Sequence, residues 1–158
     1  MRKLVLFLTA IVWSVVMNAQ ALVPISWTAY GLTFDAPKGI LVEEDTEDTF
    51  LLNNSRFYIS LQSLDSEDMT KEDMSDLLKG LADDDGVREQ SKVESFDLKQ
   101  FHGTWLKGIA EEDPCYYACL MTKDAGNVFY ISIIYNRTDA KVVERMLKSF
   151  KMEEDMGE

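Results

Sequence analysis

The chain has 158 residues, with 28 acidic and 16 basic side chains that give a net charge of −12 at neutral pH. Because a chain this acidic repels phosphate backbones and anionic headgroups, the composition argues against nucleic-acid and membrane-surface binding. Hydrophobic residues make up 46% of the chain, which favours a packed globular domain over a disordered chain.

The first 21 residues have the three parts of a secretory signal peptide. A Met-Arg-Lys start precedes an apolar run at 4–16 and an Ala-Gln-Ala motif at 19–21. Cleavage is predicted after Ala21, with cleavage after Ala19 or Gln20 as alternatives. It would leave 137 residues and, by removing Arg2 and Lys3, change the net charge from −12 to −14. An uncleaved anchor is the competing interpretation, but the run is short for a membrane span, so no stable insertion is expected after cleavage. The compact leader is typical of a bacterial protein that is periplasmic or secreted.

Strands dominate the first half of the predicted mature chain. Apolar residues alternate with polar ones within 27–37, which predicts a half-buried strand that ends at Pro37-Lys38-Gly39. A second short strand is possible at 40–45. Segments 49–52 and 56–64 flank an Asn-Asn-Ser turn, so they predict a β-hairpin.

A helix is expected after this hairpin. Thr70 is a suitable N-cap with Asp73 three residues later, and apolar residues recur with helical spacing from Met74 to Leu81. Three consecutive aspartates follow at 83–85. Because carboxylates oppose the dipole at a helix C-terminus, the helix is expected to end by about Ala82.

The second half predicts strands at 93–98, 101–110, 115–122 and 127–135, the last of them apolar on nearly every residue and therefore central. A closing helix is predicted from Thr138 or Asp139. Its apolar stripe comprises Val142, Val143, Met146, Leu147 and Phe150. The domain is predicted to span 22–152 and to be followed by an acidic tail at 153–158.

The element order predicts an α+β fold, a twisted antiparallel sheet packed by two amphipathic helices. It resembles the PsbP-like fold, an α/β/α sandwich. The matching segments are Leu-Thr-Phe-Asp-Ala-Pro-Lys-Gly at 32–39 and Met-Leu-Lys-Ser-Phe-Lys at 146–151. This resemblance implies a binding or assembly module and supplies no catalytic residues.

Residues suited to catalysis or metal binding are few. His102 is the single histidine, and its position in a predicted strand favours a structural role over catalysis. Cys115 and Cys119 would lie about 13 Å apart on one strand, too far for a disulfide unless a turn intervenes, so two buried thiols are favoured. The aspartates at 83–85 fail the EF-hand pattern. We therefore predict no catalytic residues, no metal site and no cofactor.

Exposed aromatic side chains are the candidate ligand surface. Trp105, Tyr116 and Tyr58 lie on predicted strands, where aromatic rings can form a platform for carbohydrate or peptide. Rim packing is the alternative and the more common role of such residues.

Two functional hypotheses remain at this stage. The first is an exported, non-catalytic binding or assembly module with a protein or small-molecule partner in the cell envelope. The second is a small envelope hydrolase that uses Glu111, Glu112 and Asp113 as acid and base. A pocket that encloses carboxylates with perturbed pKa values would favour the hydrolase.

Overall fold

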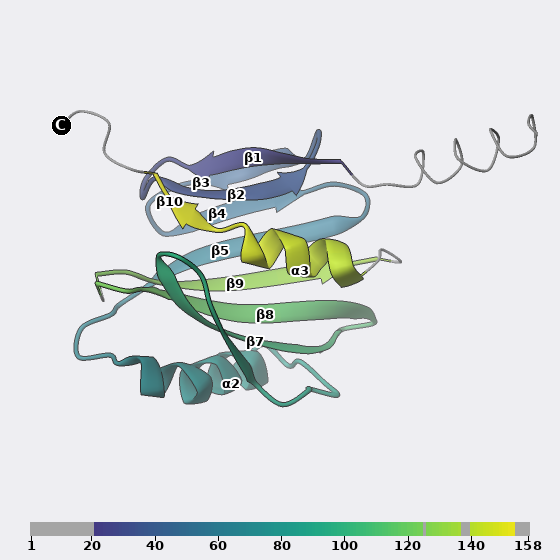
Figure 1. Cartoon of the computed structure of the whole chain (residues 1–158). Helices are drawn as coiled ribbons and strands as arrows, with labels where there is room; N and C mark the ends of the chain where they lie inside the picture. Colours follow the sequence, from purple (N-terminus) through teal and green to yellow (C-terminus); the bar gives the residue numbers. More distant parts are fainter. Residues whose placement is uncertain (1–20, 125, 137–139, 154–158) are drawn as a thin grey trace, which may run out of the picture.

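The computed structural model describes residues 21–124, 126–136 and 140–153 (Figure 1). The predicted signal peptide up to residue 20, the predicted start of the closing helix at 137–139 and residues 154–158 of the predicted tail lie outside the described residues. No described helix has the length and apolar character needed to cross a membrane.

Seven strands form one antiparallel sheet in the order β3-β4-β5-β9-β8-β7-β6. Its strands are β3 (Leu41–Asp45), β4 (Thr49–Asn53), β5 (Phe57–Leu64), β6 (Glu94–Asp97), β7 (Phe101–Ala110), β8 (Asp113–Thr122) and β9 (Val128–Tyr135). The predicted hairpin is confirmed, since the Asn54 side-chain oxygen accepts hydrogen bonds from the backbone N–H groups of Arg56 and Phe57, both at 2.8 Å. The predicted central strand is also confirmed, because β9 lies between β5 and β8.

A second, three-stranded sheet was not predicted. It has the order β1-β2-β10 and consists of β1 (Leu22–Trp27), β2 (Leu32–Pro37) and β10 (Lys151–Met152). The predicted strand that ends at Pro37-Lys38-Gly39 is confirmed as β2, whereas β1 and β10 were not predicted. The chain turns between β1 and β2, and Gly31 takes a φ of +64° there. Glycine suits this left-handed conformation because it has no Cβ.

Two apolar layers hold the fold together. On one face of the large sheet, the small sheet and α3 (Ala140–Lys148) cover a core that includes Phe34, Ile59 and Ile131. On the other face, α2 (Met74–Asp84) packs on β7 and β8 over Leu78 and Cys119. Figure 1 shows α2 beside β7, near one edge of the large sheet, and α3 in front of the middle strands β5 and β9. The predicted α+β sandwich is confirmed, with the small sheet as an added part of one layer.

The start of α2 follows the prediction and its end does not. A 3₁₀ turn, η1 (Lys71–Asp73), precedes the helix, and the Thr70 N–H donates to the Asp73 carboxylate at 2.9 Å as in a capping box. The helix runs to Asp84 instead of ending at Ala82. The acidic end is tolerated because its carboxylates have partners. The Tyr130 hydroxyl donates to Asp85 at 2.9 Å, and the Gln90 amide donates to Asp83 at 2.7 Å.

The closing helix buries the predicted stripe. Val143, Met146 and Leu147 are fully buried, and Phe150, which lies just beyond the end of α3, stacks on Phe34 with ring centroids 4.6 Å apart. The backbone is also held at the first residue of the predicted tail. The Glu153 N–H donates to the Gly31 carbonyl at 2.7 Å.

Cys115 and Cys119 are both free and buried, in agreement with the geometric argument against a disulfide. Loss of solvation on burial raises the pKa of Cys115 to about 11 and that of Cys119 to about 12. Neither thiol is therefore an activated nucleophile, because the thiolate is the reactive form.

Candidate functional site

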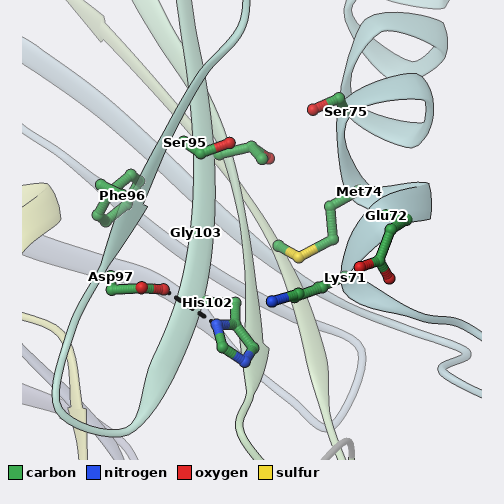
Figure 2. A pocket seen from close by; sticks show the side chains of 10 residues that line it. Lys71, Glu72, Met74, Ser75, Ser95, Phe96, Asp97, His102 and Gly103 are labelled. Carbon is green, nitrogen blue, oxygen red and sulfur yellow. Dashed lines mark hydrogen bonds and ion pairs between the residues drawn. The ribbon is translucent and has the colours of Figure 1, made fainter.

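A hollow of about 510 Å³ lies between the first turn of α2 and the β6–β7 hairpin (Figure 2). One wall comes from Lys71, Glu72 and Ser75, and the other comes from the paired strands. Figure 2 shows the Lys71 and Glu72 side chains directed towards the side of the hairpin that carries His102. Polar groups from two elements that are distant in sequence therefore converge on one open hollow.

His102 and Asp97 are hydrogen-bonded to each other on the hairpin wall. They are cross-strand neighbours, and the His102 Nδ1–H donates to the Asp97 Oδ1 at 2.9 Å. This hydrogen bond is the main reason that the pKa of Asp97 lies below its usual value, and the charges of Lys123 and Lys71 lower it further. Asp97 is therefore a carboxylate at neutral pH, and it fixes the orientation of the imidazole.

The hairpin that carries this pair is held by aromatic packing on its other face. A Cβ on Gly103 would lie 2.5 Å from the Phe96 ring, so only glycine lets that ring cross β7 at this position. The Phe96 ring then packs against Trp105 with centroids 5.1 Å apart. This contact fixes β6 against β7 and, with it, the separation of Asp97 and His102.

The opposite wall is fixed by the capping box described above. Because the Asp73 carboxylate holds Thr70, the η1 turn places Lys71 and Ser75 beside the hollow. The side chains of Lys71, Ser75 and Ser95 form no hydrogen bond or ion pair within the described part of the chain. They are therefore available to a ligand.

Among the described residues that line the hollow, Thr104 alone has a buried polar group without a hydrogen-bond partner. It is 3% exposed, and its hydroxyl oxygen has no hydrogen-bond partner among the described residues. Leaving such a group unpaired costs about 1–3 kcal/mol. A rotation of this side chain towards a bound ligand would recover part of that cost.

The hollow offers hydroxyl, imidazole, ammonium and carboxylate groups together. This set suits a polar ligand that both donates and accepts hydrogen bonds. Among the described residues, no group of three or more His, Cys, Asp or Glu side chains has a metal-binding arrangement.

The structure separates the three predicted aromatic residues. Trp105 and Tyr116 are buried neighbours, with ring centroids 5.6 Å apart, on the face covered by α3. The Tyr116 hydroxyl donates to Glu144 of α3 at 3.0 Å, and burial raises the pKa of this tyrosine. Tyr58 is 43% exposed and lies on the opposite face, where its cross-strand neighbour is Ile134. The three therefore form no common platform, and packing accounts for Trp105 and Tyr116.

The three predicted carboxylates lie at the far end of the β7–β8 hairpin. Glu111 and Glu112 are exposed in its turn, and Asp113 is the exposed first residue of β8. Glu111 has a φ of +57°, and its carbonyl accepts a hydrogen bond from the Arg88 guanidinium. None of the three lines the hollow that contains His102.

Sequence reasoning noted His102 and missed Asp97, Lys71 and Thr104. The available signal was the five-residue separation of Asp97 and His102. A tight turn at 98–100 makes these two residues cross-strand neighbours.

Comparison with protein families gives one assignment. A family model described as dihydro-orotase-like matches residues 2–139. The chain belongs to this family. A search of curated proteins found no match.

Solved structures show the fold of this dihydro-orotase-like member. The Ran-binding protein Mog1p from Saccharomyces cerevisiae is 12% identical, with a TM-score of 0.61, over 85% of this chain and 96% of that one. A point mutant of Mog1 gives a TM-score of 0.61 at 12% identity, over 84% and 96% of the two chains. At this identity the likeness shows a shared fold and no more.

Proposed function

We propose that the protein is an exported, non-catalytic binding module of the bacterial cell envelope, and that it engages its partner at the hollow beside His102. The observation that carries the proposal is the convergence of unpaired polar groups, from η1 and from the β6–β7 hairpin, on one hollow of about 510 Å³. A binding role is also supported by the fold shared with Mog1p, which its description names as Ran-binding. The resemblance to PsbP-like proteins fits the same role and stays a prediction.

Export is part of this proposal and rests on the leader at residues 1–21. Protein isolated from its native host is expected to begin at or near Leu22, because a signal peptidase would cut after the Ala-Gln-Ala motif. Intact-mass measurement of the envelope and culture fractions checks this. Recovery of the chain with Met1 intact from the envelope would contradict export with cleavage.

The binding site is tested by capture from the host's envelope fraction with the processed protein as bait. His102→Gln and Lys71→Ala are each expected to reduce recovery of the captured partner about tenfold, since one hydrogen bond to a charged group is worth about 1.5–3 kcal/mol. Thr104→Val is expected to weaken capture while leaving the free energy of unfolding unchanged or higher, because it removes an unpaired buried hydroxyl.

Lys92→Ala is the matched control, since Lys92 is exposed and lies outside the lining of the hollow. Equal recovery with all four variants would place the interaction elsewhere on the molecule.

A second candidate is an enzyme that acts on dihydro-orotate, which only the family description favours. The carboxylates proposed for a hydrolase, Glu111, Glu112 and Asp113, lie outside the hollow. Incubation of the processed protein with dihydro-orotate, followed by chromatography for a ring-opened product, separates the two candidates. Under our proposal the substrate is recovered unchanged.

A further inference from the structure

A second groove, of about 690 Å³, lies between the β6–β7 turn and the segment that leads from α3 through β10. Apolar atoms of Leu98, Phe150 and Met152 contribute to its lining. These residues come from two parts of the chain about fifty positions apart, so the groove exists only in the folded domain.

Three lysines give this groove a positive charge on an otherwise acidic molecule. Lys99, Lys148 and Lys151 are exposed along it, and none forms an ion pair within the described part of the chain. Among the described residues that line the groove, Glu153 alone is acidic, and it is engaged elsewhere. Its carboxylate accepts hydrogen bonds from the Ser26 and Thr33 hydroxyls, at 2.8 and 3.3 Å.

The groove also borders an open strand edge. Within the described part of the chain β10 pairs only with β2, and the Glu153 N–H points to that side, where it donates to Gly31. Since N–H groups alternate along a strand, the Met152 N–H points outwards. There it donates to the Gln100 side-chain oxygen at 3.0 Å, in the place that the carbonyl of a further strand would take.

We propose that this groove docks an extended acidic segment of a partner protein, which adds a strand to the free edge of β10. Backbone hydrogen bonds to β10, the Met152 N–H among them, supply affinity, as in other cases of strand addition. Carboxylates on the segment meet Lys99, Lys148 and Lys151, and apolar side chains cover Met152 and Phe150. This surface is separate from the His102 hollow and does not depend on its role.

The charge distribution favours a short acidic segment over a membrane or a nucleic acid. The chain as a whole has a net charge of −12, so the surface around the groove repels an extended anionic surface. Screening limits this repulsion to about 8 Å at physiological ionic strength, so a peptide that touches only the groove meets mainly the three lysines.

Peptide selection tests the proposal even though the partner is unidentified. A displayed library of random peptides is panned against the full processed chain. We expect the enriched sequences to carry several Asp or Glu residues. Their affinity should fall at least about tenfold with Lys99→Glu combined with Lys151→Glu, as expected when close charge pairs are reversed. Affinity that survives this reversal but falls with His102→Gln would place the peptides in the hollow and contradict the proposal.

A backbone readout tests the strand addition itself. In Gln100→Ala the Met152 amide loses its acceptor, so its hydrogen exchange should be fast in the free protein and slow when an enriched peptide is bound.

The control for the lysine reversal is Lys38→Glu combined with Lys92→Glu. It makes the same charge change outside the groove and should leave peptide affinity within about twofold, as expected for separated surface charges.

Four outcomes would overturn the proposal. They are no enrichment, enriched peptides without acidic residues, affinity that survives the lysine reversal, and binding that appears only after removal of residues 154–158. The last outcome would assign the groove to the chain's own acidic C-terminus.

Discussion

Leu147→Ala is expected to lower the free energy of unfolding by about 2–5 kcal/mol, as large-to-small changes in a packed core do. Leu147 is fully buried and lies on α3 in the core shared with β9 and the small sheet. Its truncation leaves a cavity between α3 and the sheet. Partial collapse of the helix onto the sheet would place the loss at the lower end of the range.

Chemical denaturation followed by circular dichroism measures this loss. Arg145→Ala is the matched control, because Arg145 lies on the exposed side of the same helix and its loss should cost about 0.5 kcal/mol or less. Equal small losses in both variants would mean that α3 is peripheral, and the two-layer core described above would then be wrong.

Elements with a strong local signal were predicted well. Buried residues alternate with more exposed ones over the first six residues of β5, β9 is apolar at nearly every residue, and the Thr70 capping box marks the start of the first helical segment. Each of these features depends on residues within a few positions of one another. Secondary structure and the burial of α3 could therefore be predicted before any pairing was known.

Features that depend on pairing could not be predicted in the same way. β1 is short, contains Pro24 and gains its stability from pairing with β2. The turn between Asp97 and Phe101 has no glycine, proline or asparagine, so the spacing of Asp97 and His102 was a weak sign of the hairpin that joins them.

The candidate sites show the same limit. Tyr58, Trp105 and Tyr116 all lie on strands, yet only the register of β5, β9 and β8 shows that Tyr58 faces away from the other two. Lys99 and Lys151 become neighbours along one groove only when β10 returns to pair with β2. Tertiary pairing, which short-range patterns do not encode, determines both sites.

Trp27→Ala is expected to cost about 3–5 kcal/mol, because Trp27 is a large, fully buried side chain in the core between the small sheet and the large one. Its indole N–H donates to the Thr46 carbonyl at 2.7 Å, and its ring stacks on Phe50 with centroids 6.0 Å apart. Trp27→Phe keeps much of the packing and loses the hydrogen bond. Its cost should therefore be smaller, at least about 1 kcal/mol.

Denaturation of both variants, with Lys38→Ala as an exposed control in the turn after β2, decides whether the small sheet belongs to the cooperative unit. We expect one transition in every case, with a lower midpoint for Trp27→Ala. A separate early transition, with the main midpoint unchanged, would show that β1, β2 and β10 unfold independently. That result would also weaken the proposed acidic-segment groove, since the free edge of β10 exists only while β10 stays paired with β2.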